Sequence, residues 1–158
     1  MKRNIYADFS YLVVLAATYG AVMVLGMLVA PVIFNANDFT VDLVVNKYNS
    51  GIIMGEIFHR FAVWTYVLAF VVLVYEGLMY KKGQRDRYIF VSASLVVFTS
   101  LMFSGVYSPR ILEMQTMGVE ATQSDTFASL HMASEIDFKI LAVALVVLFI
   151  RRLMLMKI

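Results

Sequence analysis

Four long apolar segments, separated by polar stretches, run through the sequence. They cover residues 9–34, 51–80, 88–107 and 127–150. An α-helix rises about 1.5 Å per residue, so about 20 residues cross a hydrocarbon core of about 30 Å. The pattern predicts an all-α integral membrane four-helix bundle, with residues 1–158 as a single transmembrane domain.

The connections between these segments differ in length. Residues 81–87 make a short polar turn, which predicts that the second and third helices are antiparallel neighbours. The other two connections, 35–50 and 108–126, are longer and contain apolar positions such as Val41 and Ile111. We expect these to form short amphipathic helices on the outer surface.

The composition supports a membrane protein and narrows its chemistry. Hydrophobic residues make up 61% of the chain, against roughly 45–50% in soluble domains. The chain has no cysteine, which excludes disulfides, thiolate metal sites and cysteine nucleophiles. No Ser-His-Asp order, P-loop or dinucleotide fingerprint is present, so the sequence does not decide whether the protein is an enzyme.

Basic residues predict the orientation of the bundle. Nine of the thirteen lie at the two chain ends and in the 81–87 turn: Lys2, Arg3, Lys81, Lys82, Arg85, Arg87, Arg151, Arg152 and Lys157. The other two connections hold only Lys47 and Arg110. By the positive-inside rule both termini are cytoplasmic, in a bacterial inner membrane. The lipid bilayer is the expected partner, and nucleic acid is not.

Two of the apolar segments also carry ionisable residues. An ionisable side chain at the centre of a membrane helix costs roughly 2.5–3.5 kcal/mol, so it usually pairs, binds a ligand or lines a polar cavity. The second segment contains Glu56, His59 and Arg60, and the fourth contains His131, Glu135, Asp137 and Lys139.

Helical spacing groups these residues. Residues three or four apart share one face of a helix, which brings Glu56 next to His59 and Arg60, and Glu135 next to His131 and Lys139. Asp137 falls about 120° away from His131. Both segments run from outside to inside, so the two histidines are predicted at a similar depth, where they could face each other.

Besides the movement of protons or a solute without a bound metal, three interpretations of this pattern stand side by side. In the first, Glu56–Arg60 and Glu135–Lys139 are ordinary ion pairs that neutralise each other. In the second, Glu56, His59, His131 and Glu135 bind a metal ion such as Cu, Fe or Zn. In the third, His59 and His131 are the axial ligands of haem b. In the second and third, Arg60, Asp137 and Lys139 tune the charge of the site.

Several sequence segments resemble a known family. These are Gly26 to Phe34, Gly51 to Phe58 and Phe127 to Ser134. They resemble a bacterial family of small four-helix membrane proteins of unknown function, related to CopD-like copper-resistance proteins and more distantly to haem-binding membrane protoporphyrinogen oxidases. The resemblance implies a functional histidine in the fourth helix, here His131, and copper or haem handling by analogy.

The sequence therefore favours a small inner-membrane protein that binds a metal ion or haem between its second and fourth helices. Transport, delivery and electron transfer are the corresponding activities. The alternative is a non-catalytic assembly subunit, whose polar residues pair with a second copy or with a helix of a membrane complex.

Overall fold

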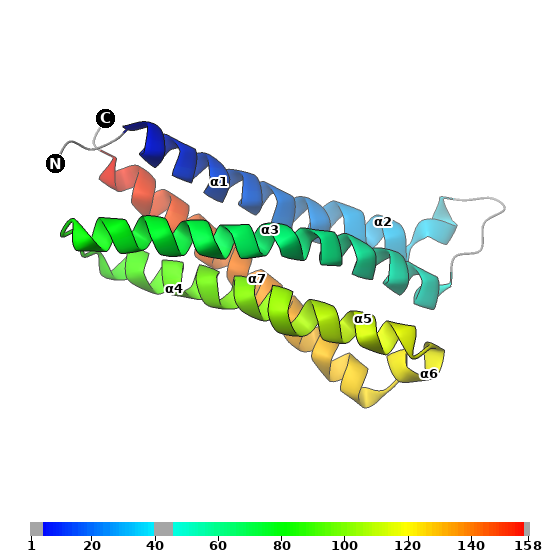
Figure 1. Cartoon of the computed structure of the whole chain (residues 1–158). Helices are drawn as coiled ribbons and strands as arrows, with labels where there is room; N and C mark the ends of the chain where they lie inside the picture. The colour runs from blue at the N-terminus through cyan, green and yellow to red at the C-terminus, as the bar shows by residue number, and fades with distance from the viewer. Residues whose placement is uncertain (1–4, 40–45, 157–158) are drawn as a thin grey trace.

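The chain folds into long helices that run side by side. The computed structural model describes residues 5–39 and 46–156, and all regular secondary structure in these ranges is helical. The first rod consists of α1 (Ile5–Val24), the π-helical turn η1 (Leu25–Val29) and α2 (Ala30–Phe34), followed by the short 3-10 turn η2 (Ala36–Asp38). Figure 1 shows this rod beside α3 (Lys47–Lys81), the longest helix.

The return half of the fold is a second rod and a long final helix. The rod consists of α4 (Arg87–Met102), the π-helical turn η3 (Phe103–Tyr107) and α5 (Ser108–Thr116). The short α6 (Val119–Thr122) then leads into α7 (Asp125–Leu155). In each rod the π turn comes just before a proline near the start of the next helix. Proline has no N–H for the residue four positions back, which favours a local change of helical register there.

Polar side chains between the apolar segments cap the helices. The side chain of Asn46 accepts a hydrogen bond from the N–H of Asn49 at 2.8 Å and starts α3. Asp86 does the same for α4, and Ser124 for α7. Each cap satisfies backbone N–H groups that would otherwise lack a partner.

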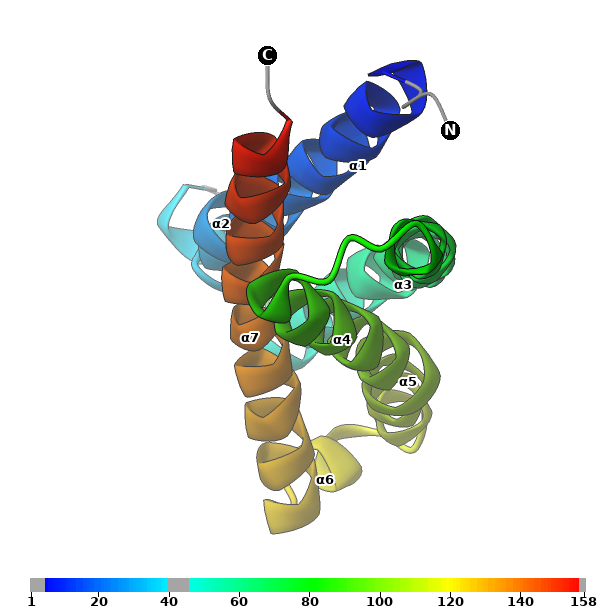
Figure 2. The same ribbon diagram turned by 90° about the vertical axis from the view of Figure 1, so that its left-hand side faces the viewer.

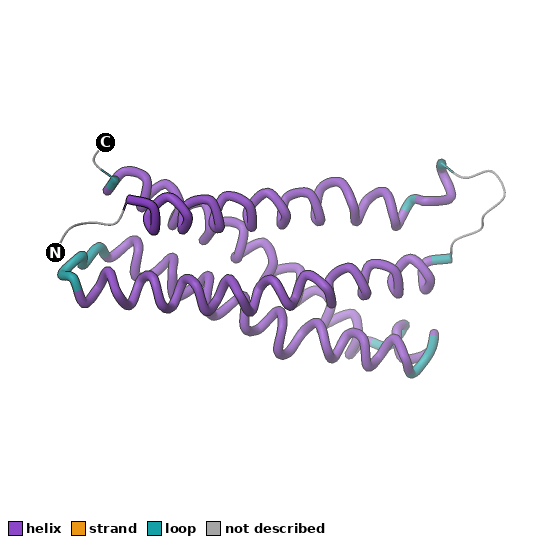
Figure 3. The backbone as a smooth tube through the Cα atoms, turned by 45° about the horizontal axis from the view of Figure 1, so that its top comes forward, coloured by secondary structure: helices purple, strands orange, loops and turns teal. Residues whose placement is uncertain are grey.

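Both described chain ends and the turn between α3 and α4 lie at one end of the molecule (Figure 1; Figure 3). We call this the basic end, and the opposite end, with α2, α5 and α6, the distal end. In the end-on view of Figure 2, α7 lies beside α1 and α4, and α4 also packs on α3. The core between the helices is aliphatic, and its fully buried members include Leu15, Leu68, Val72, Leu141 and Leu145.

The outward face of the helices is strongly apolar. Phe70, Phe98 and Val143 are each more than half exposed, which is normal where lipid replaces water. Three helical rods are long and apolar enough to cross a membrane: residues 5–34, 47–81 and 87–116. The predicted all-helical fold is thus confirmed for the described residues, and the length and composition of the three rods support a membrane protein. The final helix, α7, has 31 residues, but charged positions interrupt its apolar stretch.

The structure corrects one expected boundary. Residues 108–116 do not form a separate helix on the surface, because α5 continues the rod of α4 and η3 (Figure 1). Its inward side chains pack against α3, and Gln115 is only 7% exposed. The apolar positions around Val41 lie outside the described residues.

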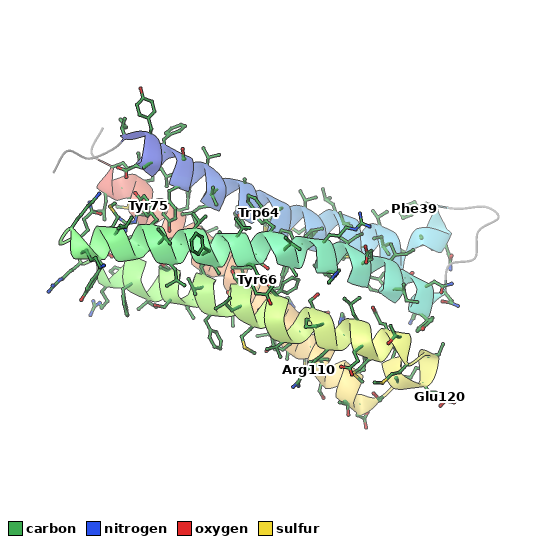
Figure 4. The ribbon with its side chains drawn as sticks, in the orientation of Figure 1. Phe39, Trp64, Tyr66, Tyr75, Arg110 and Glu120 are labelled. Atoms are coloured by element: carbon green, nitrogen blue, oxygen red, sulfur yellow. The ribbon has the colours of Figure 1, made fainter. Side chains whose placement is uncertain are left out.

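A partly buried polar network holds the basic end together. The guanidinium of Arg152 in α7 forms an ion pair with Glu76 in α3 and donates to Gln84 Oε1 at 2.7 Å. Tyr11 of α1 donates to Glu76 Oε1 at 2.8 Å, and its ring stacks on that of Tyr75, which Figure 4 labels at this end. We call Tyr11, Tyr75, Glu76, Gln84 and Arg152 the basic-end network. It joins α1, α3, α7 and the α3–α4 turn.

Candidate functional site

The polar residues of α3 lie on its outer face. Arg60 Nε donates to Glu56 Oε1 at 2.7 Å, and the two side chains are 79% and 53% exposed. His59, one residue away, is also exposed. The predicted i,i+4 neighbours therefore meet, as an ion pair on the surface of the molecule.

The polar residues of α7 form a second linear group. His131 Nε2 lies 3.2 Å from Glu135 Oε1, and Lys139 Nζ lies 3.5 Å from Glu135 Oε2. Glu135 thus bridges an imidazole and an ammonium on consecutive turns of one helix. The ring of Phe127 stacks parallel to His131 at 6.0 Å between centroids. We call His131, Glu135 and Lys139 the α7 triad.

Aromatic rings occupy the contact between α3 and α7 at this level. Phe58 packs edge-on against Phe138 at 5.4 Å and against Phe103 at 5.6 Å. Phe58 directly precedes His59, so the face of α3 that turns towards α7 is the phenylalanine face. The structure does not bring the two predicted polar groups into one site. Across residues 5–39 and 46–156, no group of three or more His, Asp or Glu side chains could hold a metal ion.

Asp137 points into the bundle, away from the α7 triad, as the helical period predicts. It is 6% exposed, and its Oδ2 has no hydrogen-bond partner in the described part of the chain. It is one of two charged side chains on the buried face of α7, the other being Arg152.

A cavity of the described structure lies at the distal end. It has a volume of about 700 Å³ and lies between the first rod, α3, α5 and α7. His131, Glu135 and Lys139 all line it, whereas Glu56, His59, Arg60 and Asp137 do not. Most of the lining is apolar and aromatic, with Met23, Met27, Met54, Phe34, Phe58, Phe103, Phe127 and Phe138 among its members.

A second polar wall of the cavity comes from α5. Gln115 Nε2 donates to the carbonyl oxygen of Gly51 at 2.8 Å, which orients the amide. Both Gln115 and Ser108 line the cavity. Gln115 Oε1 and Ser108 Oγ are themselves buried from it, and they have no hydrogen-bond partner in the described residues. Tyr48 also holds this segment by donating to the Gln115 carbonyl oxygen at 2.8 Å.

Two glycines make this close approach of α5 to α3 feasible. A Cβ on Gly55 would lie 2.4 Å from Gln115 Oε1, well inside van der Waals contact, and a Cβ on Gly51 would lie 3.6 Å from Nε2. The four-residue spacing puts both glycines on the same face of α3. Because Gly55 has no side chain, the Gln115 amide can lie flat on the backbone of α3.

The sequence pointed to part of this site. Local spacing identified the α7 triad, because i,i+4 contacts follow from helix geometry alone. The sequence did not indicate Ser108 and Gln115 as site residues, because residues 108–126 were predicted to be a connection between helices. The signal for them was the pair Gly51 and Gly55, which marks a place where another segment approaches the helix.

Comparison with known proteins places the chain at family level. A domain of unknown function (DUF4149) matches residues 13–120. No curated protein and no solved structure matches the chain. The resemblance to a family of unknown function is therefore confirmed, whereas nothing in these comparisons links the chain to CopD-like proteins.

Proposed function

This chain belongs to the DUF4149 family, and we propose that it is an inner-membrane protein that binds a small amphipathic molecule in the distal cavity. The observation that carries the proposal is the cavity itself, about 700 Å³ in volume. Ligand sites in proteins are typically concave, roughly 300–1,000 Å³, and mostly apolar, with a few polar groups that orient the ligand. The apolar lining with His131, Glu135, Ser108 and Gln115 on its walls has this character.

The lengths of the helices support a position of the cavity near the outer membrane surface. With 35 residues, α3 is about 52 Å long at about 1.5 Å per residue, well beyond a hydrocarbon core of about 30 Å. If the core begins at the basic end near Lys81, about 20 residues bring its far boundary to Phe61. Glu56, His59 and Arg60 then lie outside the hydrocarbon, where an exposed polar or charged side chain carries little free-energy cost.

The same positioning gives the proposed topology. The basic end is cytoplasmic by the positive-inside rule, α7 is the fourth span, and the cavity opens towards the outer surface. The cavity has exposed edges, since Met27 is 65% exposed and the Lys139 side chain 75%. A molecule dissolved in the outer leaflet can reach it from the lipid.

The α7 triad is the proposed polar contact for the head of the ligand. His131 offers an imidazole, and Glu135 and Lys139 offer opposite charges within one helical turn. Haem b belongs to the proposed ligand class and would have His131 alone as its axial histidine, because His59 does not line the cavity. A bare Cu, Fe or Zn ion would find fewer than three His, Asp or Glu ligands in the described residues, so an organic ligand is favoured.

A cavity-filling variant tests this proposal. Ala142 lines the cavity, and Ala142→Trp should fill it, whereas Ile150→Trp changes an exposed position two turns along the same helix. We expect wild-type protein purified in lipid nanodiscs to retain about one small molecule per chain by mass spectrometry of a solvent extract. Ile150→Trp should retain it and Ala142→Trp should lose it.

Haemin titration provides the second arm of the test. A saturable Soret band in the wild type that disappears in Ala142→Trp and in His131→Ala would identify the ligand as haem. Identical extracts from all variants, together with no saturable haemin binding, would contradict a ligand cavity. That result would favour the assembly-subunit alternative.

A further inference from the structure

An open apolar groove of about 600 Å³ follows the contact between α4 and α7 on the outer face of the bundle. The two helices pack along each other (Figure 2). Ser92 and Ala144 line the groove and are each 3% exposed, so small side chains lie where the helices meet. Larger apolar side chains, all at least 38% exposed, flank them: Val91, Leu95, Ile140, Val143 and Val147. We call this the α4–α7 groove, and its walls are accessible from the lipid.

The length of the groove corresponds to one leaflet of a bilayer. Its lining residues on α7 fall between positions 136 and 147, a segment about 17 Å long at about 1.5 Å per residue. Half of a hydrocarbon core of about 30 Å is about 15 Å. Arg87, the first residue of α4, lines the groove at the basic end. The groove therefore fits one acyl chain of a lipid whose head group lies at the basic end.

Two guanidinium groups lie beside this end of the groove. The ring centroid of Tyr88, which also lines the groove, is 5.7 Å from the Cζ of Arg87 and 4.9 Å from that of Arg151. Arg151 forms an ion pair with Asp86. Arg87 is exposed and has no ion pair in the described part of the chain, so one positive charge is left over where the head group would lie. Basic sites between membrane helices on the cytoplasmic side favour anionic head groups.

We propose that the α4–α7 groove binds an anionic glycerophospholipid of the cytoplasmic leaflet, with one acyl chain along the apolar walls and the phosphate on Arg87. The length of the groove and the unpaired charge at its mouth determine this occupant. A zwitterionic lipid offers the same chain, but its own cation lies near Arg87 and weakens the attraction. This inference goes beyond the distal cavity and shares with the proposed function only the topology.

Two lipids with identical chains test the head-group preference. Dioleoylphosphatidylglycerol is anionic, and dioleoylphosphatidylcholine is zwitterionic. We expect native mass spectrometry of the wild type, released from micelles with equal amounts of both, to find phosphatidylglycerol as the first bound lipid about fivefold more often. Ala142→Trp fills the distal cavity and should keep this preference, because the lipid lies in the other site.

Matched variants then assign the head group and the chain. Arg87→Gln should lower the preference to about twofold or less, and Arg87→Lys should keep it, because the charge is retained. Arg85→Gln removes an exposed arginine of the same turn that does not line the groove, and it should keep most of the preference. Val143→Trp fills the groove and should lower the binding of both lipids severalfold. Val63→Trp makes the same change at a position of α3 outside the groove, 64% exposed against 65% for Val143, and should not.

Several outcomes would overturn the lipid site. No preference in the wild type, an unchanged preference in Arg87→Gln, or an equal fall in Arg85→Gln would leave only a general attraction between the basic end and anionic lipid. Unchanged binding in Val143→Trp would exclude the groove, and loss of the preference in Ala142→Trp would place the lipid in the distal cavity. The extracted ligand and the haemin titration test the proposed function separately.

Discussion

At the scale of single residues, the absence of a side chain at Gly55 determines how closely α5 can approach α3. Its missing side chain lets the Gln115 amide reach the backbone of α3, and this contact joins α5 to α3 at the distal end. The adjacent residues Phe58 and His59 also show how much depends on a single position. One position along a helix rotates a side chain by about 100°, which decides whether a ring or an imidazole faces α7.

Gly55→Ala should lower stability, because its Cβ would force Gln115 away and break the bond to Gly51. We expect a loss of about 1 kcal/mol or more, measured by thermal unfolding in detergent. Gly77→Ala is the matched control on the same helix, since a Cβ there meets nothing within 4 Å. It should be neutral or stabilising by about 0.5–1 kcal/mol, as for glycine to alanine in a helix interior. Equal effects of the two changes would contradict the role of Gly55.

At the scale of elements, the basic end is held by ion pairs that differ in burial. Arg152 is 5% exposed and its partner Glu76 13%, whereas Arg151 is 32% exposed and its partner Asp86 17%. Removing one member of a buried pair leaves an uncompensated charge, and this usually costs more than the pair itself contributes. The two adjacent arginines should therefore behave differently.

Arg152→Met should destabilise the protein strongly, by about 3–5 kcal/mol, because Glu76 would remain buried without its cation. The double variant Arg152→Met with Glu76→Gln should recover much of this loss, since a neutral amide still accepts from Tyr11. Arg151→Met should cost less. Thermal unfolding of the wild type, Arg152→Met, Glu76→Gln and the double variant measures the coupling, and additive losses would show that Glu76 and Arg152 act independently.

Asp86 should make stability depend on acid pH. Its partial burial would raise its pKa, but the Arg151 guanidinium and the N–H groups of Ile89 and Tyr88 outweigh this and hold the pKa of Asp86 below its ordinary value. The contribution of Asp86 is thus present above the ordinary aspartate pKa of about 3.9 and is lost as pH falls through the lower folded value. We expect Asp86→Asn to flatten the decline of the unfolding temperature between about pH 5 and pH 3. An unchanged decline would refute this linkage.

At the scale of the whole molecule, charge is distributed unevenly along the bundle. The network around Arg152 and the cluster of lysines and arginines lie at one end, and the cavity lies at the other. In the proposed membrane placement, the apolar outer surface between them contacts lipid, and the part of α3 that exceeds the hydrocarbon core lies on the cavity side. In the proposed arrangement the ligand site lies near one membrane surface and the basic-end network near the other.

A topology reporter tests this arrangement. A reporter that is active only in the cytoplasm should work when fused at either terminus or inserted at Arg85, and should be inactive at Glu120, because basic residues stay on the cytoplasmic side. A C-terminal fusion that is inactive while the N-terminal fusion is active would show an odd number of crossings. It would remove α7 from the set of membrane spans.

The sequence alone determined the class of the protein, the helical segments and the contacts within each helix. Hydropathy, turn composition and the 3.6-residue period are local properties, so they predicted the α7 triad and the pair Glu56–Arg60. The rotation of each helix about its axis was decided only by tertiary packing. In helices that are apolar on most sides, lipid-facing and buried positions look alike in sequence, and only the fit between Phe58, Phe103 and Phe138 sets the orientation. Tertiary packing also decided the contacts of Gln115 with Gly55 and of Arg152 with Glu76. The members of these pairs lie 60 and 76 positions apart, so no local sequence pattern joins them.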